Sequence, residues 1–173
     1  FLAVRPRVSH EVPREFLNAC GCLENALELD AVLLIQDRSE FQSLMSGPHP
    51  TRVIGVPRVW ETLQQARSGD AFAAPYAVPF IQSVPTLAEM TNAALNVLDD
   101  DPDGFFLMVE GGAVDWAAHS NQPGRTIEER IEFNRAIEAV LNWVEMNSNW
   151  GETLLVVAAD HAGLELKEFV KRF

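Results

Sequence analysis

The chain has 173 residues, of which 47% are hydrophobic and 22% charged, and its formal net charge at pH 7 is −12. This length is ordinary for a single domain, and the apolar fraction is sufficient for a packed core. The acidic balance argues against a nucleic-acid surface, since binding to the phosphate backbone requires a basic face. An acidic protein can still act on phosphates where bound metal ions reverse the local charge.

The ends and the cysteines of the chain give few constraints on its location. No apolar run reaches about eighteen residues, so no membrane span is predicted. The chain opens at Phe1 without a signal peptide, and we expect it to begin after processing or inside a longer protein. Cys20 and Cys22 are too close for an unstrained disulfide and lack a second cysteine pair for zinc, so we interpret them as helix residues.

The first half of the chain alternates helical and strand patterns. The expected elements are a helix over 16–27, a strand over Ala31–Gln36, a short helix over 37–45 and a strand over Thr51–Val56. Gly47–Pro50 must form a turn, in which His49 is expected to be an exposed loop residue and not a ligand. Residues 59–67 predict a helical turn or two. Residues 68–83 have no period, and irregular connections of this length are often functional.

The next helix is marked by its capping residues. Thr86 and Glu89 have the spacing of a capping box, and an apolar stripe follows them over 87–98. The acidic run Asp99–Gly104 then stops the helix. It lacks the pattern of a calcium-binding EF-hand loop, so a solvated turn is expected.

A strand, a helix and a second strand are predicted in the last third. Apolar runs at Phe105–Glu110 and Thr153–His161 indicate the strands, and a capping box at Thr126 and Glu129 indicates a helix that ends near 147. Its buried side is expected to consist of Ile127, Ile131, Ile137, Leu141 and Val144. A connection of this kind makes the two strands parallel and brings their carboxyl ends to one edge, where α/β sheets bind ligands.

Acidic and histidine side chains gather at the predicted ends of these strands. Glu110 ends the first, and Asp160 with His161 ends the second. Between them Asp115 and His119 are spaced i,i+4, which places both on one face of a helix. Carboxylate with imidazole suits zinc, whereas a carboxylate without histidine suits magnesium. Each residue alone would more often be a helix cap or a structural group, and it is the set that indicates a metal centre.

These segments carry a resemblance to a known family. The stretches VPTLAEMTNAALNVL, PDGFFLMVEGGAVDWAAHSN and TLLVVAADH resemble the alkaline phosphatase family, most specifically in the block Glu-Gly-Gly-x-x-Asp-x-x-x-His. The resemblance implies that Glu110 belongs to a magnesium site, that Asp115 and His119 bind one zinc ion, and that Asp160 and His161 bind a second. It also implies a mainly parallel sheet flanked by helices, hydrolysis of phosphate monoesters through a phosphoserine, and a periplasmic or secreted homodimer.

The sequence departs from the family pattern in ways that bear on catalysis. It contains no Asp-Ser pair for the nucleophile and no Asp-Gly-Met-Gly segment, and no histidine follows His161. The phosphate-holding arginine and the threonine of the magnesium site also belong to the family segment that has no counterpart here. We therefore assign no catalytic residue, and expect residues 1–173 to be one partial α/β domain, an incomplete sandwich of the alkaline phosphatase type.

Two other interpretations remain open. The chain could be a non-catalytic metal-binding or packing remnant of that fold. The tail VAADHAGLELKEFVK resembles the opening of the type B ribose-5-phosphate isomerase family, in which backbone amides at a helix N-terminus bind a sugar phosphate. That resemblance covers a short stretch, and we rank it below the phosphatase.

Overall fold

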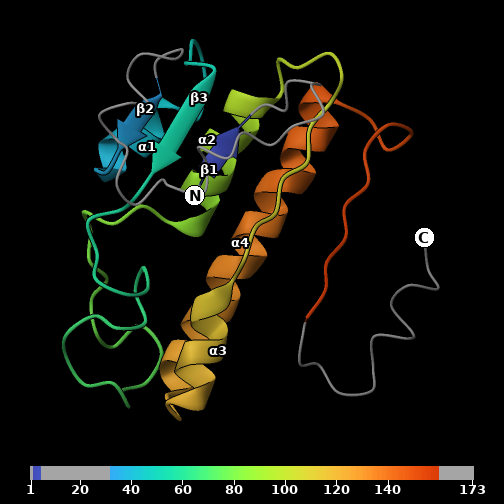
Figure 1. Ribbon diagram of the computed structural model, residues 1–173. Coiled ribbons are helices and arrows are strands. Elements are labelled where there is room, and N and C mark those ends of the chain that lie inside the picture. Colours follow the sequence, from blue (N-terminus) through green and yellow to red (C-terminus); the bar gives the residue numbers. More distant parts are fainter. Residues whose placement is uncertain (1, 5–31, 160–173) are drawn as a thin grey trace, which may run out of the picture.

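The structure, a computed structural model, describes residues 2–4 and 32–159 of the chain. Its strands are β1 (Leu2–Val4), β2 (Leu33–Ile35) and β3 (Arg52–Gly55), and its helices are α1 (Arg38–Ser43), α2 (Leu87–Leu98), α3 (Gly112–His119) and α4 (Pro123–Asn147). In the sheet, β3 lies between β2, to which it is parallel, and β1, to which it is antiparallel. The predicted α/β class is confirmed (Figure 1). The expected helix over 16–27, with Cys20 and Cys22, lies outside the described residues.

One apolar cluster joins the small sheet to the first two helices. It consists of Ile35, Phe41, Leu44, Val53, Ala93, Val97 and Leu98, all nearly inaccessible to water. The strands predicted at Ala31–Gln36 and Thr51–Val56, and the short helix between them, are confirmed with narrower bounds. Because α1 and α2 both contribute to the cluster, burial of this apolar surface holds them against the sheet.

Helix α2 begins with the capping box that its sequence predicts. The Thr86 side chain accepts a hydrogen bond from the Glu89 amide, and the Glu89 carboxylate accepts one from the Thr86 amide. Arg38 of α1 also donates to Glu89 through Nε and Nη2, and Gln42 donates to it at 2.8 Å. Burial raises the pKa of Glu89, but the hydrogen bonds from Arg38 and Gln42 outweigh it and lower the pKa below its ordinary value. This carboxylate therefore both caps α2 and ties it to α1.

Helix α4 is the longest element, with α3 beside its first turns and α2 beside its later ones (Figure 1). It begins at Pro123, an ordinary first helical position for proline, and not at the predicted capping box of Thr126 and Glu129. That prediction was wrong because the Thr126 hydroxyl donates to the Gln122 carbonyl and so already lies within the first turn. The predicted end near residue 147 is confirmed.

The predicted buried side of α4 was largely wrong. Ile127 and Leu141 are 49% and 39% exposed, whereas Val144 is buried as expected. Apart from Gly124, the buried residues in the first half of the helix are instead charged: Arg125, Glu128, Glu129 and Glu132. The physical reason is the neighbouring segment, because residues 57–85 cover this half of α4 and supply polar groups.

Residues 57–85 form an irregular excursion beside the first half of α4. The predicted helical turns at 59–67 were wrong, whereas the irregular course of 68–83 is confirmed. Side-chain hydrogen bonds take the place of backbone pairing in this segment. The Gln64 side chain accepts a hydrogen bond from the Ile81 N–H at 2.9 Å and donates one to the Ile81 carbonyl at 3.0 Å. Gln65 donates to the side chain of Gln122, which precedes α4. The excursion is thereby fastened to the rest of the fold without secondary structure.

The two strands predicted around α4 are not formed in the described part of the chain. Residues 104–110 and 153–159 run extended but belong to no ladder, so the predicted parallel unit is not observed. Both segments instead line a groove of about 1230 Å³ along α4. Phe106 and Met108 are 85% and 74% exposed, while Phe105 and Leu107 pack on the core, which is the alternation of a strand without a neighbour. Apolar character predicted the extended course of both segments, but no described segment forms hydrogen-bonded strand pairs with either of them.

The Glu89 contacts give a test of this arrangement. We expect Glu89→Ala to lower the free energy of unfolding by about 1–3 kcal/mol, since it removes a cap and leaves Arg38 without its carboxylate. Urea denaturation measures this change. A double-mutant cycle with Arg38→Ala should show coupling, whereas Glu138→Ala, on the exposed side of α4, should change stability by less than about 0.5 kcal/mol. Equal losses in the two glutamate variants would contradict the role assigned to Glu89.

Candidate metal centre and acidic pocket

Helix α3 presents the acid and the histidine of the predicted metal block together. The His119 Nε2 and Asp115 Oδ1 atoms are 3.3 Å apart, and the two side chains are 77% and 55% exposed. Asp115 lies in the first turn and His119 in the last, the positions that the helix dipole favours for an anion and a cation. The i,i+4 prediction is therefore confirmed as a juxtaposition, on a face of the helix that is open to solvent.

The glycine pair before α3 is required by close packing. A Cβ atom at Gly111 would lie 2.8 Å from the Phe133 ring of α4, too close for any side chain. A Cβ at Gly112 would meet the Glu110 carboxylate at 3.3 Å. The turn thus sets α3 directly against α4, with Ala117 fully buried between them. Asp115 and His119 therefore lie on a helix that cannot shift without disturbing α4.

The structure separates Glu110 from Asp115 and His119. Glu110 lies at the rim of a recess that also includes Gly111, Gly112 and Trp116. The ligand atoms of Glu110, Asp115 and His119 do not all lie within 4.8 Å of one another. Asp160 and His161 lie outside the described residues. The predicted convergence of all five residues therefore remains a prediction.

One group in the described ranges does bring three ligand atoms within 4.8 Å, and the sequence interpretation had dismissed its members. It consists of His49, Asp99 and Asp100. The His49 side chain is only 8% exposed, so the expectation of an exposed loop residue was wrong, and its Nε2 lies 3.3 Å from Asp100. Its Nδ1 faces the Pro50 carbonyl, while Asp99 accepts a hydrogen bond from the Trp143 indole. These contacts give the group a structural role in joining the 47–50 turn to the end of α2, and make it a possible His/Asp metal-binding group.

Buried acids of α4 form a second feature that sequence reasoning missed. Glu128 pairs with Arg67 at 2.8 Å, each with a 2% exposed side chain, and accepts the Tyr76 amide. Glu129 and Glu132 line the recess of about 500 Å³ between α4 and the excursion. The sequence does indicate that these charged residues lie together, since Arg125, Glu129 and Glu132 are spaced by four and three residues and so share one face of the helix.

Burial changes the titration of one of these acids. Desolvation, with the nearby Glu132 carboxylate, raises the pKa of Glu129 from 4.5 to about 7. One of its carboxylate oxygens is buried without a hydrogen-bond partner among the described residues. Glu129 is therefore a high-energy anion near neutral pH.

On fold and ligand chemistry, the chain falls in the class of α/β proteins with a candidate divalent-metal site. Comparison with protein families matches residues 27–172 to the family described as alkaline phosphatase, and the chain belongs to that family. The match includes the tail on which the isomerase resemblance depended, so we do not pursue that alternative.

Named relatives agree with this assignment. Alkaline phosphatase H of Pseudomonas aeruginosa is 33% identical over 141 residues, which are 81% of this chain and 28% of the relative. Alkaline phosphatase 3 of Bacillus subtilis is 38% identical over 88 residues, 51% of this chain and 18% of the relative. A protein of Bombyx mori named membrane-bound alkaline phosphatase is 43% identical over 77 residues, 44% of this chain and 13% of the relative. The chain thus spans under a third of the length of these relatives.

Glu129 gives a pH-dependence that can be measured. Because its folded pKa lies above the unfolded value, the folded state binds more protons between about pH 4.5 and 7, and stability falls as pH rises through that window. We expect a loss on the order of 1–3 kcal/mol between pH 5 and pH 8. Urea denaturation should show this slope in the wild-type chain and a flatter one in Glu129→Gln. Identical slopes in both proteins would mean that Glu129 titrates normally.

Proposed function

We propose that this chain carries metal ligands of a metal-dependent phosphomonoester hydrolase. Asp115 and His119 hold one zinc ion, Asp160 and His161 hold a second, and Glu110 holds magnesium. The proposal is supported by family membership and by the position of the first pair on one exposed helix face. The substrate class is phosphate monoesters, and no nucleophile is assigned to any residue of this chain.

The observation that carries the proposal is the spacing of the Asp115 and His119 ligand atoms. Two atoms at about 2.0–2.1 Å from a tetrahedral zinc ion lie about 3.3 Å apart. The Asp115 Oδ1 and His119 Nε2 atoms, which contact one another directly, are also 3.3 Å apart. The pair therefore suits zinc with little rearrangement, although a closed zinc site takes three or four protein ligands.

A bound zinc ion would supply a Lewis acid for phosphoryl oxygens and lower the pKa of a bound water. The chain itself contributes by holding Asp115 and His119 in position. Ala117 and Gly111 fix α3 on α4, and the exposure of Asp115 and His119 leaves open the side from which further ligands and a phosphate ester would approach. A rigid helix with an open ligand face is what a catalytic metal site needs, since it keeps a position for substrate.

Location and assembly form part of the same proposal. By family resemblance we infer a periplasmic or secreted homodimer, although one relative is named as membrane-bound. No helix within the described ranges is long and apolar enough to cross a membrane. The competing function is a non-catalytic remnant of the fold, which is favoured by the high exposure of two ligands that have no third partner within the described residues.

Zinc affinity separates the site from a remnant. We expect the purified chain to bind zinc weakly and His119→Ala or Asp115→Asn to bind it at least about tenfold more weakly, since each removes half of a two-ligand set. Competition with a chromophoric chelator measures the dissociation constants. Glu138→Gln removes an exposed carboxylate from α4 and should leave affinity unchanged. Equal binding by all four proteins would refute the assignment of Asp115 and His119.

Catalysis gives an independent test. We expect the 173-residue chain with zinc and magnesium to hydrolyse an aryl phosphate no faster than the free ions do, because no seryl nucleophile is assigned here. Absorbance of the released phenol measures the rate. Chelator-sensitive turnover above the free-ion control would show that this chain is catalytically sufficient. Sequencing the gene upstream of Phe1 would show whether an Asp-Ser pair and an Asp-Gly motif are encoded there.

A further inference from the structure

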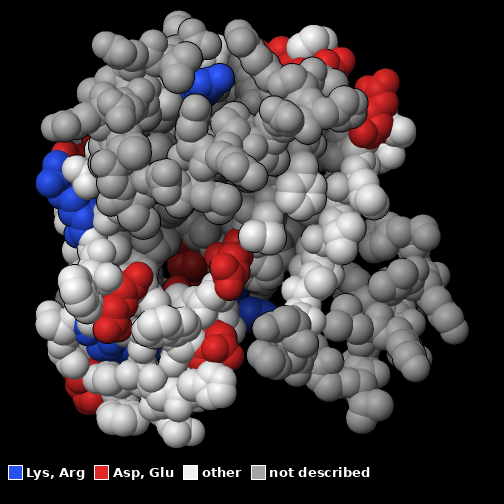
Figure 2. Space-filling model, in the orientation of Figure 1, with Lys and Arg blue, Asp and Glu red and all other residues white. Residues whose placement is uncertain are grey.

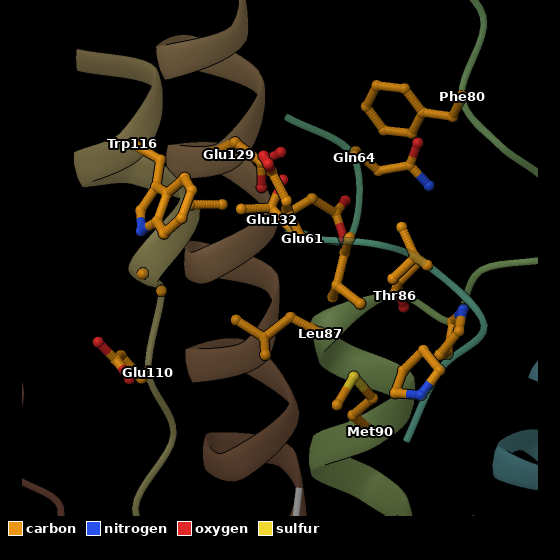
Figure 3. A pocket seen from close by; sticks show the side chains of 18 of the residues that line it. Glu61, Gln64, Phe80, Thr86, Leu87, Met90, Glu110, Trp116, Glu129 and Glu132 are labelled. Carbon is orange, nitrogen blue, oxygen red and sulfur yellow. The ribbon is translucent and has the colours of Figure 1, made fainter. Parts of the chain in front are cut away.

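A recess of about 500 Å³ lies between the excursion, the start of α2, the turn into α3 and the first half of α4. Figure 3 shows Glu129 and Glu132 projecting from α4 toward Glu61 of the excursion, with Trp116 on one side and Gln64 and Phe80 on the other. In the space-filling view, acidic atoms lie in and around a hollow on this face of the molecule (Figure 2). The recess combines carboxylates with a mainly apolar lining that includes Leu63, Leu87 and Met90.

The basic residues near the recess form no ion pair with Glu129 among the described residues. Arg67 forms its ion pair with Glu128, and Arg125 donates to the Gln65 carbonyl. Arg135 pairs with Glu132 from a half-exposed position. Arg125 lies one helical turn before Glu129, and its Nε and Nη2 are buried without a hydrogen-bond partner among the described residues, but no described ion pair joins it to Glu129.

Glu129 is the observation that points to a ligand. The residue is only 7% exposed and lines the recess, and its Oε1 is shielded from water without a hydrogen-bond donor in the described part of the protein. A buried acceptor left unpaired costs free energy comparable to a lost hydrogen bond, and more when it is charged. A cation entering the recess would supply the missing partner once the Glu129 carboxylate rotates to expose Oε1.

The aromatic rings favour an organic cation. Trp60 and Trp116, which are 93% and 52% exposed, line the same recess as the carboxylates. Indole faces attract ammonium and guanidinium groups. The protein already uses this contact beside the recess, where the Arg67 guanidinium lies 4.6 Å from the centre of the Phe80 ring.

A bare metal ion fits the recess less well. Glu61, Glu129 and Glu132 do not bring three ligand atoms within 4.8 Å of one another, since the one described group that meets this limit lies elsewhere, at His49. A metal would also leave the apolar and aromatic lining without a partner. An alkylammonium or guanidinium group on a hydrocarbon body would contact both, and the net charge of −12 would attract it from solution.

We propose that this recess is a binding site for an organic cation, an ammonium or guanidinium group with an apolar body, held between the Glu129 carboxylate and the indoles of Trp60 and Trp116. The site does not include Asp115 or His119, although Glu110 lies at its rim, and its occupancy requires no metal. It is an addition to the proposed phosphatase function and does not depend on it.

The test uses benzylammonium as the probe and benzyl alcohol as its neutral analogue, at pH 8 without metal. We expect the ammonium to bind at least about tenfold more tightly, as is typical for one charge-assisted hydrogen bond. Tryptophan fluorescence and isothermal titration calorimetry measure binding. Glu129→Gln should reduce the preference to about twofold or less, and Glu61→Gln, at an exposed position, should weaken ammonium binding about threefold.

Glu138→Gln is the matched control, because it removes the same charge from an exposed position on the same helix. Equal binding of ammonium and alcohol would overturn the proposal, and so would an equal loss in Glu138→Gln, which would indicate general attraction to an acidic protein. Absence of ammonium binding up to tens of millimolar would also overturn it. Tight magnesium binding that depends on Glu129, with no ammonium binding, would assign the recess to a metal instead.

Discussion

The buried ion pair between Arg67 and Glu128 is the contact on which the candidate site most depends. Both side chains are 2% exposed, and they join an excursion without regular structure to the first half of α4. The pair is embedded in further hydrogen bonds, since Glu128 accepts the Tyr76 amide and Arg67 donates to the Val78 carbonyl. Removing one partner would leave the other charged and buried, which is far more costly than never having formed the pair. The excursion, and with it one wall of the recess, is therefore held by charge more than by apolar burial.

The parts of the fold that sequence predicts well are those set by neighbours along the chain. The capping box of α2 and the i,i+4 placement of Asp115 and His119 are local, and both are observed. The strand at Phe105–Glu110 failed for the opposite reason, because apolar and aromatic composition favours extended backbone but a ladder needs a second segment from elsewhere. Propensity cannot supply that segment, and among the described residues none forms a ladder with it.

The same distinction explains the errors at α4 and at the site. A hydrophobic stripe identifies the buried face only when the neighbouring element is apolar, and the segment beside Glu128 and Glu129 offers Arg67 and backbone amides instead. His49 was misjudged because its partner, Asp100, is fifty-one residues away. Metal-ligand spacing identified the α3 pair, whereas the acids of the recess carry no motif at all. Their significance comes from burial, which sequence does not report.

The unpaired extended segments have a consequence for the handling of this chain. Residues 105–109 read Phe-Phe-Leu-Met-Val, with high β-propensity and without charge or proline, and they offer backbone groups that belong to no ladder. Such an edge is a template for a second copy, so the chain on its own should associate through strand addition as its concentration rises. Asp103 and Glu110 flank the run as gatekeepers against that association. Neutralising Glu110 to probe magnesium binding would therefore also remove a charge that opposes aggregation, and loss of function in that variant must be read beside its state of assembly.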